Sequence, residues 1–204
     1  MIKRIRKLFI LALSVLLLFS LSATSSAAEV EDNSIEGMDA HFSLESNGTI
    51  FFNTDAALTA GYSATAVMTV KERIDYLNSL VLSGEAFINE NFGAVISCSH
   101  TRSSNDVSYI VENWDGTIDV YLSDEDTKSM KSALSYAQQG LDPRTFITDL
   151  PFRIQGYALA ACLAGNVQAQ LYKQQIINAE SYGTGVVMHI FYIDGTQYIT
   201  FYAQ

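Results

Sequence analysis

Basic residues are scarce in this sequence. Its 204 residues include 12 Lys and Arg against 22 Asp and Glu, which gives a formal net charge of −10. Phosphate backbones and anionic lipid head groups repel such a chain, so nucleic acids and anionic membranes are poor partners for it. A basic protein or a neutral ligand remains open as a partner, and the same charge also serves to keep a protein soluble.

Cysteine and histidine are scarce as well. The chain has two Cys and three His, with no CxxC motif and no two His at metal-ligand spacing. We therefore expect neither a metal site nor a cofactor. Cys98 and Cys162 are candidates for a disulfide, because an even cysteine count in an exported protein favours one. Two buried thiols are the alternative, since cysteine is a common core residue.

The sequence has one long apolar run, at residues 8–21. Four cations precede it within residues 1–7, and small residues follow at 22–28. This is the three-part pattern of a secretory signal peptide. The run is fourteen residues long, short of the roughly 20 that span a bilayer. We expect residues 1–28 to be cleaved, the mature protein to be secreted to the extracellular space without stable membrane association, and its charge to be −14.

The remaining chain is organised around a repeated turn motif. Residues 29–40 are acidic and predict a flexible lead-in to a single domain at residues 41–204. Within that domain, Asn-Gly-Thr or Asp-Gly-Thr occurs at 47–49, 115–117 and 194–196. Asn-Gly and Asp-Gly favour the tight turns of hairpins. The hairpins predicted are residues 41–54, 107–122 and 186–203, and a further strand is predicted at 93–99.

Helices are predicted between the hairpins. Thr69 and Glu72 form a capping box ahead of a helical apolar pattern, and residues 56–68 are ambiguous between strand, loop and an earlier helix start. Ser123 begins a second helix that ends at Gly140. A third helical stretch covers residues 149–179, with a break at 165–166. Its small residues at 156, 160 and 164 suit close helix packing. Strands and helices cluster instead of alternating, so the fold class is α+β with a mostly antiparallel sheet and two or three helices.

Two arrangements suggest nucleophilic catalysis. Residues 61–65, Gly-Tyr-Ser-Ala-Thr, approach the Gly-x-Ser-x-Gly turn of hydrolases but lack its final Gly. Ser63 would be the nucleophile and His189 its base. Cys98 is a second candidate nucleophile for the same histidine. The alternatives are a helix-start serine and a cysteine that is buried or bonded.

The C-terminal hairpin predicts an unusual sheet face. A two-residue turn at 194–195 places Phe191 opposite Tyr198, His189 opposite Thr200 and Val187 opposite Tyr202. One face then carries His189, Phe191, Tyr198 and Tyr202 where an exposed sheet normally has polar residues. Either a helix covers this face or it is an aromatic platform for a ligand.

The middle hairpin predicts an acidic face. A two-residue turn at 115–116 would place Glu112 directly opposite Asp119, with Trp114 and Tyr121 on the same face. Opposed like charges are unfavourable, so a basic partner would relieve them, unless the pair is simply solvated.

The function expected from these features is that of a secreted, non-enzymatic binding or interaction module whose ligand the sequence does not identify. The alternative is a small secreted hydrolase that uses Ser63 or Cys98 with His189.

The export signal makes the first testable prediction. Secreted protein should begin at or near Glu29, because Ala28 and its small neighbours form the cleavage site. Mass spectrometry of the secreted chain would measure this directly. Recovery of an intact segment 1–28 would contradict it and indicate a membrane anchor instead.

Overall fold

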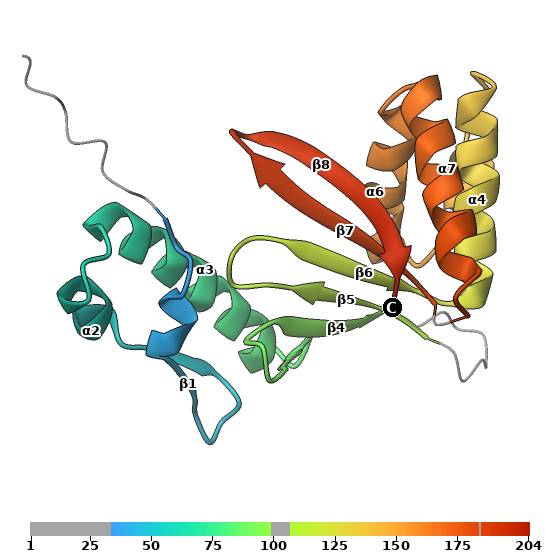
Figure 1. The fold of residues 1–204 in the computed structure, drawn as a ribbon. Helices are drawn as coiled ribbons and strands as arrows, with labels where there is room; N and C mark the ends of the chain where they lie inside the picture. The colour runs from blue at the N-terminus through green and yellow to red at the C-terminus, as the bar shows by residue number, and fades with distance from the viewer. Residues whose placement is uncertain (1–33, 99–106, 184) are drawn as a thin grey trace, which may run out of the picture. The chain divides into compact units, whose positions relative to one another are not determined.

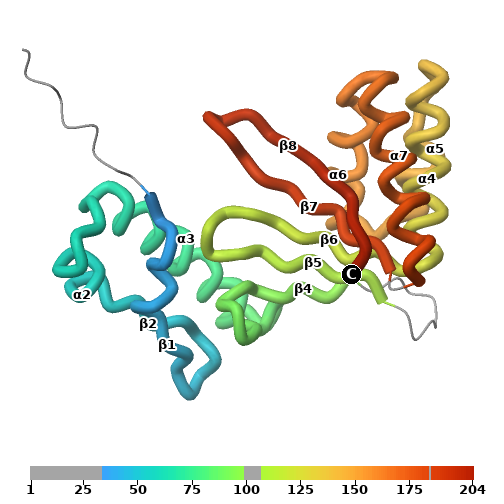
Figure 2. The backbone as a smooth tube through the Cα atoms, viewed as in Figure 1, coloured from blue at the N-terminus to red at the C-terminus, as the bar shows by residue number. Residues whose placement is uncertain are grey.

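The computed structural model describes residues 34–98, 107–183 and 185–204. They belong to one unit, Ser34–Gln204, whose path is shown in Figures 1 and 2. The predicted signal peptide lies outside the described residues, as do residues 29–33 of the predicted lead-in. The rest of that lead-in is part of the folded unit, because Met38 is fully buried in its core and Ile35 packs against it. No helix of the described segments is long and apolar enough to cross a membrane.

The N-terminal part forms a small sheet beside a long helix. A 3-10 turn, η1 (Met38–His41), leads into β1 (Phe42–Leu44) and β2 (Ile50–Phe52), which pair as the first predicted hairpin. Helices α2 (Thr54–Thr59) and α3 (Ala64–Leu82) follow. The side-chain amide of Asn78 in α3 bonds both the N–H and the C=O of Ile50, at 2.8 and 2.9 Å. The Asn78 side chain thus bonds the backbone of β2 as a neighbouring strand would. These two hydrogen bonds connect the hairpin to α3.

Helix α3 begins earlier than predicted. The Ser63 hydroxyl accepts the Ala66 N–H and caps the helix, whereas Thr69 lies inside it and donates to the Thr65 carbonyl at 3.0 Å. The capping box predicted at Thr69 is therefore wrong. Residues 56–68 were ambiguous between strand, loop and an earlier helix start, and α3 shows the earlier helix start. Ser63 supplies a cap first, so the helix is already formed when the chain reaches Thr69.

Among the described residues, the main sheet has six strands, all antiparallel and in the order of the chain. The pairing of β6 with β7 joins strands separated by all the C-terminal helices. This sheet confirms the hairpins predicted at residues 107–122 and 186–203 and the strand predicted at 93–99. It also confirms the predicted α+β class. The strands are β3 (Phe87–Ile88), β4 (Ala94–Cys98), β5 (Ser108–Glu112), β6 (Ile118–Leu122), β7 (Val186–Ile193) and β8 (Thr196–Ala203).

Four helices are described between β6 and β7, within residues 123–183, more than the sequence predicted for this region. Ser123 caps the first and Gly140, in the left-handed region at φ 73°, follows its end, as predicted. Gly165 at φ 101° breaks the third helical stretch into two, also as predicted. The helices are α4 (Asp124–Gln138), α5 (Arg144–Ile147), α6 (Phe152–Leu163) and α7 (Asn166–Glu180).

Helices pack against one face of the sheet. Ile96, Ile110, Val120 and Met188 occupy this face on four neighbouring strands and are all essentially buried. On the edge strand, Phe201 continues the row and its ring lies 5.5 Å from that of Tyr172 in α7. The Phe201 N–H also donates to the side chain of Gln175 in α7, at 3.0 Å. This face is the core of the protein.

The register predicted for the middle hairpin is wrong by one residue. Glu112 pairs with Ile118, and Val111 pairs with Asp119. Glu112 therefore lies on the helix-covered face, where Arg73 of α3 donates to its carboxylate at 3.0 Å. A buried carboxylate is tolerated because this guanidinium compensates its charge. Glu112 and Asp119 are on opposite faces, so they form no joint acidic site.

The disulfide predicted between Cys98 and Cys162 is absent. Helix α6, which carries Cys162, does lie against β4, which carries Cys98, but both side chains are buried free thiols. Burial raises the pKa of Cys98 to about 11 and that of Cys162 to about 12. The alternative of two core cysteines is the one observed.

Both thiols should resist alkylation in the folded protein. At about pH 8, a thiol with a pKa near 11 is thiolate in only about one molecule in a thousand, and burial blocks the reagent as well. We expect a maleimide to label neither cysteine before unfolding and both after it, as counted by mass spectrometry. Failure of the unfolded, unreduced chain to take up two labels would instead indicate a disulfide.

Candidate functional site

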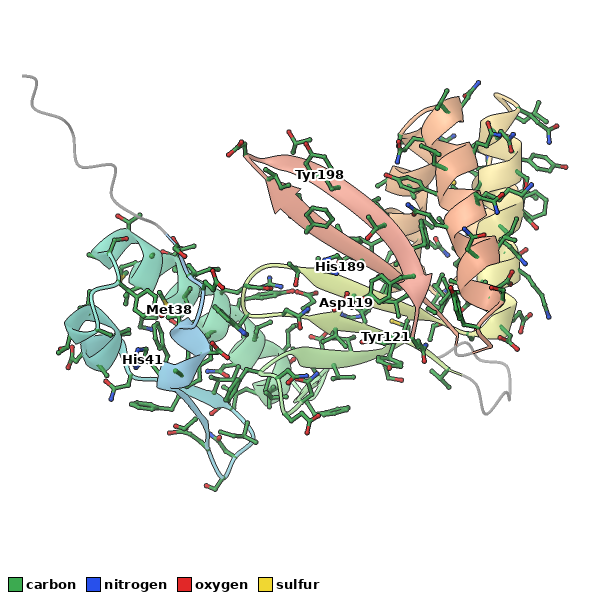
Figure 3. All side chains as sticks on the ribbon, in the orientation of Figure 1. Met38, His41, Asp119, Tyr121, His189 and Tyr198 are labelled. Atoms are coloured by element: carbon green, nitrogen blue, oxygen red, sulfur yellow. The ribbon has the colours of Figure 1, made fainter. Side chains whose placement is uncertain are left out.

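The face of the main sheet opposite the helices is the candidate site. We call it the open face. Its rings are partly or well exposed, with Phe87 62%, Tyr198 44% and Tyr202 43% exposed. Figure 3 marks Asp119 and Tyr121 on β6, His189 on β7 and Tyr198 on β8. The aromatic and imidazole side chains that the strand pairing places on the open face are Phe87, Tyr109, Tyr121, His189, Phe191, Tyr198 and Tyr202.

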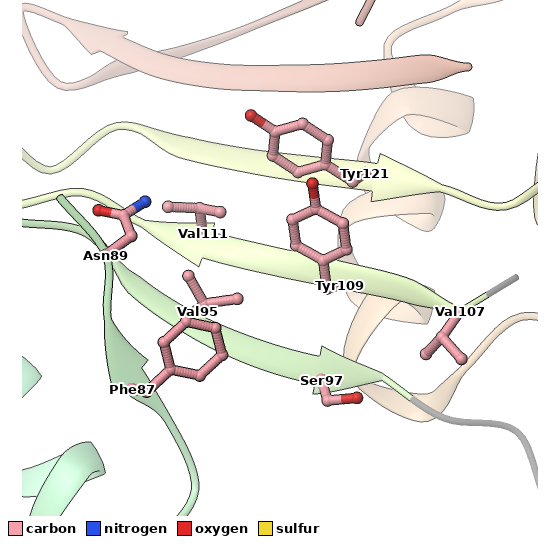
Figure 4. A pocket seen from close by; sticks show the side chains of 8 residues that line it. All are labelled: Phe87, Asn89, Val95, Ser97, Val107, Tyr109, Val111 and Tyr121. Carbon is pink, nitrogen blue, oxygen red and sulfur yellow. The ribbon is translucent and has the colours of Figure 1, made fainter. Parts of the chain in front are cut away.

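A groove of about 490 Å³ crosses the β3–β6 part of the open face. Figure 4 shows Phe87, Val95 and Val111 along it, with the rings of Tyr109 and Tyr121 beside them. Those two rings stack with centroids 4.3 Å apart and planes 9° from parallel. The stack offers a flat apolar wall with two hydroxyl groups at its edge.

A polar cluster lies in the middle of the open face, on β6, β7 and β8. The Asp119 carboxylate contacts His189 Nδ1 at 2.6 Å and accepts the Tyr202 hydroxyl at 3.2 Å. Its second oxygen accepts the side-chain amide of Asn113 at 3.1 Å. Asp119 therefore orients the imidazole ring and holds the tyrosine hydroxyl in a fixed position.

The imidazole ring continues into an aromatic row along the C-terminal hairpin. The His189 ring stacks on Phe191 with a centroid distance of 5.3 Å, and Phe191 stacks on Tyr198 with a centroid distance of 5.5 Å. The register of this hairpin is the predicted one, with Phe191 opposite Tyr198 and Val187 opposite Tyr202. The helices of the described segments do not cover this face, so its aromatic row is partly exposed, and a role in ligand binding stays a prediction.

Three tyrosines of the open face, Tyr109, Tyr121 and Tyr202, have a raised pKa. Burial raises the pKa of Tyr109 and of Tyr121, and the nearby Asp119 carboxylate also raises that of Tyr121. For Tyr202, burial is the largest cause of a raised pKa, followed by the charge of Asp119 and the hydrogen bond to it. All three hydroxyls therefore remain hydrogen-bond donors well above neutral pH.

The structure brings together six of the eight binding residues predicted from the sequence and excludes two. Asp119, Tyr121, His189, Phe191, Tyr198 and Tyr202 share the open face. Glu112 is on the covered face. Trp114 lies in the β5–β6 loop and packs edge-on against Phe42 at 5.1 Å, away from the platform.

The arrangement gives little support to a nucleophile beside His189. Cys98 points to the covered face and His189 to the open one, so the sheet separates them. The Ser63 hydroxyl caps α3. His189 is hydrogen-bonded to Asp119, and its ring neighbours are Phe191 and Tyr202.

Sequence reasoning missed Phe87 and Tyr109 as members of the site. The register predicted for the middle hairpin puts Glu112 and Tyr121 on one face, and Tyr109, an odd number of residues from Glu112, then falls on the other. Phe87 belongs to a strand of two residues, too short to produce an alternating pattern.

Within the described ranges, no group of three or more His, Cys, Asp or Glu side chains is arranged to hold a metal ion. Comparison of the chain with protein-family models, curated proteins and solved structures found no significant match.

Replacing Asp119 should change the titration of Tyr202. We expect Asp119→Asn to lower the pKa of Tyr202 part of the way to its ordinary value, because a neighbouring negative charge disfavours the phenolate and burial remains. NMR titration of the tyrosine ring carbons would measure it. Tyr109 is the internal control, since burial alone raises its pKa. An unchanged Tyr202 titration would mean that Asp119 does not hold this hydroxyl in solution.

Proposed function

We propose that the protein is a secreted, non-enzymatic binding module that uses the open face to recognise a partner. The observation that supports the proposal is that no helix within residues 34–98, 107–183 and 185–204 covers a face built from aromatic rings. Exposed apolar surface of this kind is uncommon on soluble proteins and marks interaction sites. Tyrosine and phenylalanine also provide large, stiff contact area, which suits recognition.

A basic partner is the class that the charges favour. Strands β3–β8 contain no Lys or Arg, and Asp119 is the carboxylate of the open face. The chain as a whole has a net charge of −10. Aromatic ring faces attract cations, Arg most often, so the Tyr109–Tyr121 stack and the Phe191–Tyr198 stack both suit guanidinium groups.

Binding of a basic peptide tests this function. We expect a short Arg-Gly repeat peptide to bind, a matched Gln-Gly peptide to bind much less, and added salt to weaken the interaction. Tyr121→Ser and Tyr198→Ser should each weaken binding by roughly threefold to tenfold, the range of one cation–π contact. Isothermal titration calorimetry gives the affinities.

Tyr182→Ser is the matched control. Tyr182 is 75% exposed and follows α7, outside the sheet. The proposal predicts no change in this variant. Equal affinity of wild type and both open-face variants would place the peptide elsewhere, and no binding of the Arg peptide would exclude a basic partner.

A further inference from the structure

A second concave surface lies in the α5–α6 segment and shares no lining residue with the groove on the open face. It is a groove of about 520 Å³, within the roughly 300–1,000 Å³ typical of small-molecule sites. Ile147 of α5 and Leu159 of α6 form its apolar wall, and Phe152 at the start of α6 stands 87% exposed at its rim.

Gly156 keeps this groove open. It lies inside helix α6, where glycine costs roughly 0.5–1 kcal/mol relative to alanine. A Cβ atom added at Gly156 would meet nothing within 4 Å. Close helix packing, the reason predicted from the sequence, therefore does not explain this glycine, although Ala160 and Ala161 of the same helix do pack into the core. The missing side chain leaves space in the groove.

The two neutral polar side chains of the groove, Thr148 and Gln155, each donate a hydrogen bond to a backbone carbonyl of the protein. The Thr148 hydroxyl donates to the Thr145 carbonyl at 3.0 Å, and the Gln155 amide donates to the Leu150 carbonyl at 2.9 Å. A bound peptide would bring its own backbone N–H and C=O groups into a wall that offers them few partners. A hydrocarbon chain has no such requirement.

Two guanidinium groups border the apolar wall. Arg144 and Arg153 both line the groove. Arg153 is paired with Glu85, while Arg144 is 75% exposed and 3.9 Å from Asp142. Each guanidinium has five N–H donors, so donors remain for a further carboxylate. Each arginine is already paired with one carboxylate of the protein, so a ligand carboxylate would be bound through the remaining N–H donors and not through an excess of positive charge.

We propose that the α5–α6 groove binds an anionic amphiphile of the fatty-acid class. The hydrocarbon chain lies along Ile147, Leu159 and the space at Gly156, and the carboxylate lies at Arg144 and Arg153. This site is independent of the open face and of its proposed basic partner.

Calorimetric titration with octanoate, decanoate and dodecanoate, below their micelle concentrations, tests the apolar part. Affinity should rise by up to about fourfold per added methylene until the groove is full. Gly156→Leu should fill the space without loss of thermal stability and should lower the affinity for dodecanoate at least tenfold. Ala164→Leu, which adds leucine atoms at the exposed end of α6 outside the groove, should bind as wild type does. Equal affinity in Gly156→Leu and wild type would overturn the proposal.

Replacing the two arginines tests the charged part. The double variant Arg144→Gln/Arg153→Gln should lose at least tenfold in affinity for dodecanoate and keep its affinity for dodecanol. Equal loss for both ligands, or equal wild-type affinity for acid and alcohol, would contradict carboxylate recognition. Tyr121→Ser should not alter dodecanoate binding. A loss there would place the amphiphile on the open face and overturn the assignment, whereas failure of the Arg-peptide experiment leaves this one unaffected.

Discussion

In the part of the chain that the structure describes, the helices pack against one face of a six-stranded sheet and leave the other open. Because successive residues of a strand point to opposite faces, this asymmetry assigns each strand residue either to the core or to the open face. The two acidic residues of the strands illustrate the result. Glu112 is on the covered face and is compensated by Arg73, whereas Asp119 is on the open face and organises His189 and Tyr202. A shift of one residue between β5 and β6 would place both acidic side chains on the same face of the sheet.

The turns explain which registers could be predicted. Asp194 and Gly195 both have positive φ, 49° and 74°, as in the two-residue turn assumed from the sequence, and that register was predicted correctly. At the middle hairpin only Gly116 of the dipeptide has positive φ. The Asp115 carboxylate instead accepts both the N–H and the hydroxyl of Thr117, and Asn47 does the same for Thr49. The same three-letter motif thus forms two kinds of turn, which local sequence does not distinguish.

Other parts of the site depend on contacts between distant segments. The α+β class, the two later hairpins and the cap at Ser123 follow from local patterns, and these were predicted. The free state of Cys98 and Cys162 depends on how α6 meets β4, and the groove at Gly156 depends on how α5 meets α6. Neither arrangement has a local signature. The exposure of the aromatic row around His189 likewise depends on where the helices pack, so its composition was predictable and its accessibility was not.

The position of Trp114 has a practical consequence for spectroscopy. It is the one tryptophan of the chain, and its ring contacts Phe42, which in turn lies 5.1 Å from Phe52 and 5.4 Å from Phe92. Intrinsic tryptophan fluorescence therefore reports on the contact between the N-terminal hairpin and the β5–β6 loop. A ligand held by the tyrosines of the sheet would be seen in tyrosine signals first, so the two parts of the domain can be followed separately in one sample.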